Sequence, residues 1–402
     1  MNVDMFKTPK IKPNINKNIH AIFVCIALRL FIYRSSIYTH NSFFILFYSL
    51  YLAIVFFVYE MSLEDKILPY NNVMITGTAG FIASHLAKYL VRKYPRTQFY
   101  GVDKMSYCSD VERMGEYIDD DNFMFIPIDC CNAESVMAVL RMYNIDCIIH
   151  LAAYTAVDMS FNDSVVYSKN NVVGTHVLLE CSRQYGKIKR FVHMSTDEVY
   201  GPTESPADEQ TLFAPTNPYA ATKAAAEMIC QSYIRSYKMP IVITRANNIY
   251  GPLQHEEKVI PKFMKHMLDC KPITIHGNGK VVRNFLHVES FCEAYDRVIH
   301  DGKVHEVYNI GTDFEISIID LAHKMKFNMR HEPKLFNMLT DEQKQWIMRP
   351  DDEIIINVED RIFNDTRYAL NIDKIRSLGW TDEYDFDHYL IEVMVSYIKH
   401  NA

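Results

Sequence analysis

Gly77-Thr78-Ala79-Gly80-Phe81-Ile82-Ala83 directly follows the apolar run from Asn72 to Thr76 and opens a stretch of helical length. Glycines at the first and fourth positions allow the tight turn between a buried strand and the helix after it. They also let an anionic group approach the free backbone amides at the helix N-terminus. Ala83 takes the third glycine position of this pattern and still permits close helix packing. The stretch therefore predicts the first strand, turn and helix of a dinucleotide-binding fold.

Short apolar runs and stretches of helical length alternate from here to Ala246, which is typical of buried parallel strands joined by helices. We expect strands at 72–76, 98–102, 123–128, 147–151, 190–195 and 241–246, and helices at 81–94, 133–143, 165–185 and 219–237. This order predicts an α/β fold with a Rossmann-type doubly wound parallel sheet. From Gly251 onward prolines interrupt the pattern, which indicates a smaller C-terminal substrate-binding part.

Asp103 ends the second predicted strand, at the position where a carboxylate can accept hydrogen bonds from an adenosine ribose. The same carboxylate would repel a 2′-phosphate, so NAD is favoured over NADP. Asp129, at the end of the third strand, could approach the adenine. We therefore divide the chain into an extension at 1–66, an NAD-binding Rossmann domain at 67–250 and a substrate-binding part at 251–402.

Candidate catalytic groups lie at the end of the fifth strand and at the start of the helix that follows. Ser195-Thr196-Asp197-Glu198 ends the strand, and Tyr219 and Lys223 share one helix face at i and i+4. We expect the ammonium to lower the pKa of the phenol, so that Tyr219 can serve as a base. Two neighbouring acids can be held at different pKa values and so supply one acid and one base, although such pairs also occur in solvated turns.

Composition limits the partners. The chain has 402 residues and a formal net charge of −7, so it lacks the overall basic field that nucleic-acid binding requires. Its nine cysteines include no C-x-x-C pair, and several lie within apolar runs. We expect reduced thiols in a reducing compartment and no metal site.

The N-terminal extension contains an apolar stretch at 35–59 without any Asp, Glu, Lys or Arg, long enough to be a membrane-span candidate. It is either a real membrane anchor, as one span or as a hairpin with residues 21–33, or an extension that the active protein does not need. Met61 would be a natural start in the second case. We expect a cytoplasmic protein, with anchoring through 35–59 as the alternative.

These motifs resemble the extended short-chain dehydrogenase/reductase family and, within it, the dTDP-glucose 4,6-dehydratases. The resemblance runs from about Asn71 to the carboxyl end, and the Thr-Asp-Glu triplet at 196–198 is its specific element. It implies NAD-dependent conversion of a nucleoside-diphosphate glucose, dTDP-glucose or UDP-glucose, into the 4-keto-6-deoxy sugar. Tyr219, assisted by Thr196 and Lys223, would remove the C4 hydroxyl proton during C4 oxidation. Glu198 would then take the C5 proton while Asp197 protonates the departing C6 hydroxyl, and hydride would return to C6.

The resemblance also implies three sets of site residues and a homodimer formed by the helices at 165–185 and 219–237. Catalytic roles are expected for Thr196, Asp197, Glu198, Tyr219 and Lys223. Cofactor contacts are expected for Gly77, Gly80, Phe81, Ile82, Asp103, Lys104, Ser106, Asp129, Cys130, Leu151, Ala152, Ala153, Thr155, Asn170, Tyr219 and Lys223. Substrate contacts are expected for Thr196, Asn248, Lys258, Arg283, Asn309 and Arg361.

Some stretches depart from the family pattern. Ala156 stands where the family usually has His, and Ile362 stands where Pro is usual. Both positions lie near expected ligand contacts, so they affect the identification of the substrate more than that of the reaction class. The segment 327–353 matches poorly and suggests a lid or an insertion, and Thr340 and Gln343 have capping-box spacing that predicts a short helix there.

The alternatives to a 4,6-dehydratase are a UDP-glucuronate decarboxylase or a 4-epimerase, and an inactive NAD-binding structural protein. The Asp-Glu pair argues against the enzyme alternatives.

Overall fold

The computed structural model describes residues 67–360 and 365–401, which belong to one compact unit. The membrane-span candidate at 35–59 lies outside the described residues, as do Arg361 and Ile362. Across the described stretches, no helix combines the length and apolar character needed to cross a membrane.

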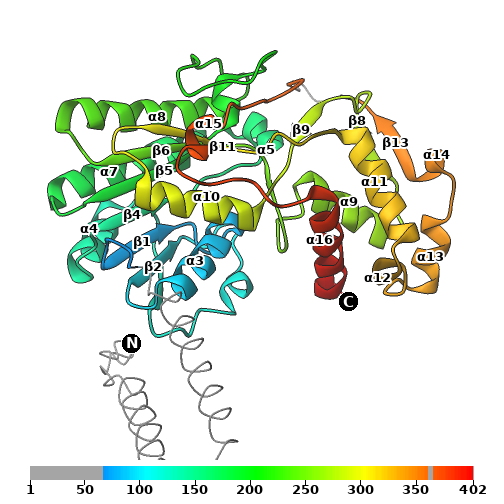
Figure 1. Ribbon diagram of the computed structural model, residues 1–402, viewed down its shortest axis with the longest axis horizontal. Coiled ribbons are helices and arrows are strands. Elements are labelled where there is room, and N and C mark those ends of the chain that lie inside the picture. Colours follow the sequence, from blue (N-terminus) through cyan, green and yellow to red (C-terminus); the bar gives the residue numbers. More distant parts are fainter. Residues whose placement is uncertain (1–66, 361–364, 402) are drawn as a thin grey trace, which may run out of the picture. The chain divides into compact units, whose positions relative to one another are not determined.

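A seven-stranded sheet forms the centre of the fold (Figure 1). All neighbouring strands are parallel, and their order is β11-β6-β5-β4-β1-β2-β3. The strands are β1 (Asn72–Thr76), β2 (Gln98–Asp103), β3 (Phe123–Pro127), β4 (Cys147–His150), β5 (Arg190–Thr196), β6 (Ile241–Ala246) and β11 (Val307–Ile310). The six predicted strands all form. The sequence pattern does not predict β11, because its four residues lie within the irregular half of the chain.

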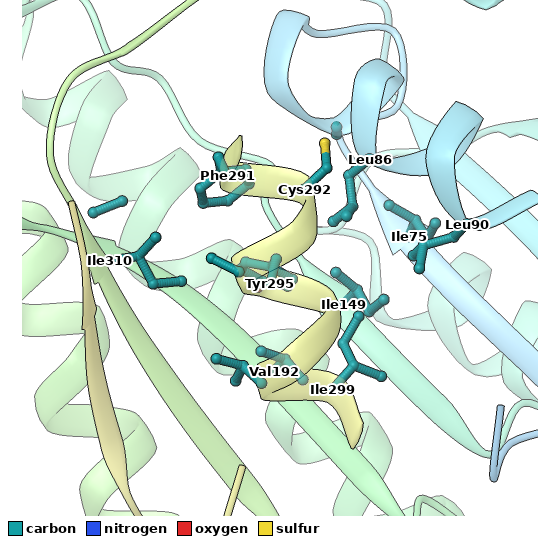
Figure 2. Packing of buried hydrophobic residues seen from close by; sticks show 14 of the residues in the cluster. Ile75, Leu86, Leu90, Ile149, Val192, Phe291, Cys292, Tyr295, Ile299 and Ile310 are labelled. Atoms are coloured by element: carbon teal, nitrogen blue, oxygen red, sulfur yellow. The ribbon is translucent and has the colours of Figure 1, made fainter. Parts of the chain in front are cut away.

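Helices cover both faces of the sheet, because alternate residues of each strand point to opposite sides. Val73 and Ile75 belong to the core beneath α3 (Phe81–Lys93) and α10 (Val288–Asp301). Met74, between them, belongs to the core beneath α4 (Ala133–Met142), α7 (Gly174–Tyr185) and α8 (Pro218–Tyr237). Figure 2 shows Tyr295 of α10 and Ile149 of β4 in the core that this helix covers. This three-layer arrangement confirms the predicted doubly wound fold.

The helix predicted at 165–185 contains a change of winding. It begins as α6 (Ser164–Tyr167), continues as the π-helical turn η2 (Ser168–Val173) and becomes α7 at Gly174. Such π turns are rare and often occur at functional sites. Here the turn carries Asn170 into the wall of a cavity that is described below.

The C-terminal part has its own core, built by α9 (Val259–Leu268), α11 (Ile318–His331) and α16 (Phe386–Asn401). Two strand pairs border it, β8 (Ile273–His276) with β13 (Ile355–Val358) and β9 (Val282–Asn284) with β12 (Glu315–Ser317). The poorly matching segment forms the end of α11 and then α12 (Pro333–Phe336), α13 (Asp341–Ile347) and α14 (Asp351–Ile354). The predicted capping box of Thr340 and Gln343 begins α13, which confirms a short helix there.

Two later stretches return to the large sheet, since α10 packs on it and β11 extends its edge. The C-terminal half of the chain therefore contributes to both parts of the unit. The remaining short elements are η1 (Val111–Met114), α5 (Val157–Asn162), η3 (Asp197–Tyr200), β7 (Ile249–Tyr250), β10 (Leu286–His287) and α15 (Asp373–Arg376).

Candidate active site

Two neighbouring cavities, of about 230 and 260 Å³, lie where the strands of the sheet end. In parallel sheets ligands bind at this edge, where the strand order reverses, and here the order reverses between β1 and β4. All residues predicted to contact the cofactor line the first cavity. The two cavities share Thr155, Glu198, Asn248, Glu257 and Lys258 in their linings.

The glycine turn after β1 forms one wall of the first cavity. Gly77 has a φ of +80°, and a Cβ there would lie 3.0 Å from the backbone of Ala152. The next helix, α3, has Gly80 as its N-cap, with no side-chain cap and no acidic residue in its first turn. Its first amides and its dipole are therefore suited to a pyrophosphate, so this wall fits a dinucleotide.

Asp103, at the end of β2, is fixed by three donors. Its carboxylate accepts hydrogen bonds from the Ala79 amide at 3.1 Å, the Met105 amide at 2.8 Å and the Ser109 hydroxyl at 2.8 Å. A held carboxylate at this place can accept a ribose hydroxyl. Next to it, Lys104 donates to the side chain of Asn170 in the π turn at 2.6 Å.

Asp197 and Glu198 lie at the start of η3, directly after β5, and different side chains hold them. Asp197 accepts hydrogen bonds from the Asn247 amide at 2.8 Å and from the Thr196 hydroxyl at 3.0 Å. Glu198 accepts one from the amide of Asn217 at 2.9 Å. Both acids line the first cavity, and Glu198 also lines the second.

Burial makes these carboxyl groups weaker acids. The pKa of Asp197 rises to about 7, because of burial first and then the negative charge of Glu198. Burial also raises the pKa of Glu198, but its hydrogen bond from Asn217 and the charges of Lys258 and Arg283 oppose this effect. The two neighbours therefore experience different fields, as an acid and base pair requires.

Tyr219 and Lys223 project from the first turns of α8 into the first cavity. Burial, followed by the charge of Glu198, raises the pKa of Tyr219, whereas a hydrogen bond with Thr196 lowers it. The expectation that Lys223 lowers the phenol pKa is therefore wrong for the protein alone. Burial lowers the pKa of Lys223 itself to about 8, and its amino group donates to the Met194 carbonyl at 2.5 Å.

Not all of the residues predicted to contact the substrate line the two cavities. Asn248 and Lys258 line both cavities, and Arg283 lines the second. Asn309 lines neither, because its fully buried side chain accepts a hydrogen bond from Tyr200 and donates to the carbonyls of Ala207 and Asn371. Its place in the fold is structural. Arg361 lies outside the described residues.

The sequence reasoning missed the residues that hold the two acids. Asn217 is the N-cap of α8 and at the same time donates to Glu198, and Asn247 follows β6. The sequence could indicate that Asn217 caps the helix that contains Tyr219. Its contact with Glu198 could not be predicted, because that contact depends on the tertiary arrangement of two loops. Asp365 and Tyr368, in the lining of the second cavity, were also missed.

Several known proteins are similar to this chain in sequence. The family described as GDP-mannose 4,6 dehydratase matches residues 74–393. The trifunctional UDP-glucose 4,6-dehydratase/UDP-4-keto-6-deoxy-D-glucose 3,5-epimerase/UDP-4-keto-L-rhamnose-reductase of Arabidopsis thaliana is 43% identical over 333 residues, 82% of this chain and 47% of that protein. This chain thus spans about half the length of the plant relatives. The dTDP-D-glucose 4,6-dehydratase of Dictyostelium discoideum is 38% identical over 354 residues, with 81% of each chain covered.

A solved structure agrees with this fold. The dTDP-glucose 4,6-dehydratase of Streptomyces venezuelae, with NAD and TDP bound, is 32% identical and has a TM-score of 0.73, covering 82% of this chain and 97% of its own. The family match extends over the glycine turn, the Thr-Asp-Glu triplet and the Tyr-Lys helix. On this evidence, the chain belongs to the dTDP-glucose 4,6-dehydratase family.

Proposed function

We propose that this chain is an NAD-dependent 4,6-dehydratase, a hydro-lyase that turns a nucleoside-diphosphate glucose into its 4-keto-6-deoxy derivative. One observation carries the proposal: two neighbouring acids, Asp197 buried and Glu198 partly buried, have different hydrogen-bond partners, and they lie beside a buried Tyr-Lys pair. Oxidation and re-reduction of a sugar need only the Tyr-Lys pair. Removal of water needs an additional acid and base, which the two carboxyl groups can supply.

The residues around the first cavity fit NAD. The uncapped N-terminus of α3 can bind the pyrophosphate, Asp103 can accept the ribose hydroxyls, and Lys223 can donate to the nicotinamide ribose. When bound, NAD⁺ supplies a hydride acceptor and a positive ring that would lower the pKa of the neighbouring Tyr219.

The chain's own groups then move three protons. Tyr219 takes the C4 hydroxyl proton, and its hydrogen bond with Thr196 favours the phenolate. Glu198 takes the proton at C5, which the C4 ketone has made acidic. Asp197, of which a pKa of about 7 leaves about half protonated at neutral pH, gives a proton to the departing C6 hydroxyl, so that water leaves. The saturated product forms when C6 receives the hydride and C5 regains a proton from Glu198.

The nucleotide is proposed as a uridine or thymidine diphosphate, since the relatives are named for UDP-glucose and for dTDP-glucose. Lys258 and Arg283 can meet the diphosphate. Purified protein should convert one or both glucose nucleotides into a 4-keto-6-deoxy sugar, identified by mass spectrometry as the loss of one water. A hexose epimer as the product, or activity only in decarboxylating UDP-glucuronate, would contradict the proposal.

We also propose a cytoplasmic homodimer, formed by α7, α8 and the turns before them. Their outer surfaces carry exposed apolar side chains, among them Val166, Val173 and Met228. An exposed apolar patch of this kind suits a second copy of the same chain. Light scattering should give twice the mass of one chain, and Met228→Lys should shift the enzyme toward the monomer. An unchanged mass in that variant would place the interface elsewhere.

A further inference from the structure

A third acid in the site has no role in the proposed steps. Asp365 is 4% exposed and lines the second cavity. One of its oxygens, Oδ2, accepts hydrogen bonds from the Thr216 hydroxyl at 2.6 Å and from the phenol of Tyr368. The other, Oδ1, has no hydrogen-bond partner among residues 67–360 and 365–401.

A buried carboxylate oxygen without a donor is costly, and nearly all such atoms in folded proteins have a partner. In a cavity that binds a ligand, the missing donor is expected to come from the ligand. A carboxylate repels phosphate, so the ligand group must be a hydroxyl or an N–H. The second cavity therefore contains both cations for the diphosphate and an acceptor for a neutral donor.

The surroundings of Asp365 indicate which part of the ligand it meets. Burial raises the pKa of Glu198, and the charge of Asp365 adds to that effect, so the two carboxyl groups are electrostatic neighbours. The guanidinium of Arg283 lies 5.0 Å from the ring centre of Tyr368, which in turn donates to Asp365. Asp365 thus lies near both the base that works at C5 and a cation assigned to the diphosphate at C1. The hexose is the part of the ligand that joins these two ends, so it is the part that Asp365 can meet.

We propose that Asp365 is a specificity-determining residue, whose Oδ1 accepts a hydrogen bond from a hexose hydroxyl that the reaction leaves unchanged, at C2 or C3. This inference rests on the proposed function, because that function fixes which end of the sugar faces Glu198. The reaction alters bonds at C4, C5 and C6 only. A contact at C2 or C3 therefore selects the sugar and orients it without taking part in the chemistry.

The test is a double-mutant cycle between the protein and the substrate. We would measure kcat/KM of the full chain for the parent glucose nucleotide and for its 2-deoxy and 3-deoxy analogues, in the wild type and in Asp365→Ala. Wild type should disfavour one of the analogues by about 10- to 100-fold, the usual range for a hydrogen bond to a charged group. Asp365→Ala should act poorly on the parent nucleotide and should distinguish it from that analogue by no more than about threefold.

Tyr368→Phe and Thr216→Val are the matched controls, because each removes a donor to Asp365 and leaves its carboxylate in place. They should keep the wild-type preference for the parent sugar. If Asp365→Ala also keeps it for both analogues, Asp365 only anchors Tyr368 and Thr216, and the proposal is wrong. Asp365→Leu, which has similar size and no acceptor, replaces the alanine variant if that one does not fold, and it should also lose most of the preference. A wild type that converts the parent sugar without losing water would refute the proposed function, while the preference ratio would still test Asp365.

Discussion

Asp197 and Glu198 show how the surroundings of two neighbouring carboxyl groups give them different protonation behaviour. The sequence predicted the acid pair and its place after a strand, because both are local properties. It did not predict Asn247 or Asn217 as their partners, since those contacts join residues 50 and 19 positions away along the chain. The separation of the two acids into donor and acceptor of protons depends on the burial of Asp197 and on the Asn217 amide and the cations near Glu198, and therefore on the tertiary fold.

Asp197→Asn removes the proposed proton donor while keeping the shape of the side chain and its contact with Asn247. We expect C4 oxidation to proceed and water loss to slow by about 10²- to 10⁴-fold, the usual contribution of a general acid. Reduced nicotinamide should then accumulate on the enzyme, and stopped-flow absorbance measures this. Normal turnover in Asp197→Asn would show that another group protonates the leaving hydroxyl.

The same substitution should alter stability in a way that depends on pH. Burial, and then the charge of Glu198, raises the pKa of Asp197 from 3.8 to about 7, so the folded protein binds this proton more tightly than the unfolded chain does. The contribution of Asp197 to wild-type stability therefore falls as the pH rises from about 4 to about 7. Relative to the wild type, Asp197→Asn should gain up to about 4 kcal/mol across that range, at about 1.4 kcal/mol per pH unit. Urea unfolding at about pH 5 and about pH 8 measures the gain, and an equal difference at both would contradict this account.

At the scale of elements, α8 must hold Tyr219 and Lys223 at a fixed depth over the sheet. A buried ion pair contributes to this, because Glu227 of α8 is fully buried and binds Arg245 of β6 through two hydrogen bonds, one of them 3.1 Å long. Arg245 also donates to the Tyr200 hydroxyl at 2.6 Å, and Tyr200 donates to Asn309 of β11 at 2.8 Å. The chain of contacts thus ties α8, β6, η3 and β11 together.

Arg245→Met should reduce the free energy of unfolding by about 3 to 5 kcal/mol, because it leaves the carboxylate of Glu227 buried without its counter-ion. The double variant Glu227→Leu with Arg245→Met should recover most of that loss, since both charges are then replaced by apolar groups. Denaturant unfolding of the two variants beside the wild type gives the comparison. A double variant as unstable as the single one would mean that packing, and not charge, explains the loss.

Much of the element plan followed from the sequence. Helices α3, α4 and α8 begin and end within one residue of their predicted limits, because glycine, asparagine and proline mark their starts. The π turn η2 could not be foreseen, since none of the residue types in Ser168–Val173 distinguishes a π turn from an α-helix. The short strand β11 was missed for a similar reason, because only its pairing with β6 identifies it.

The whole molecule contains several buried histidines that must stay neutral. Burial lowers the pKa of His150 to about 3, lowers those of His85 and His287 to about 4, and lowers that of His193 well below its usual value. Both ring nitrogens of His193 lack hydrogen-bond partners within the described chain. Between their unfolded and folded pKa values, these histidines are protonated in the unfolded chain and neutral in the folded protein.

Acid should therefore destabilise the fold in a predictable way. The stability that these histidines contribute is fully present above about pH 6.5 and is lost as the pH falls toward their folded pKa values, by about 1.4 kcal/mol per pH unit for each histidine. His193→Leu removes one of these groups and should make the decline shallower by that amount. Unfolding curves between about pH 7 and about pH 5 measure both slopes, and parallel slopes would show that His193 is not among the groups that matter.

The shared lining of the two cavities bears on how the enzyme is loaded and emptied. Glu198, Asn248 and Lys258 form part of the wall for both compartments. The first cavity opens toward the second beside these residues. A sugar nucleotide bound in the second cavity would therefore cover that opening. We expect the coenzyme to enter first, to be slowed in its escape while substrate is present, and to remain through many turnovers, so that a catalytic trace of it sustains the reaction.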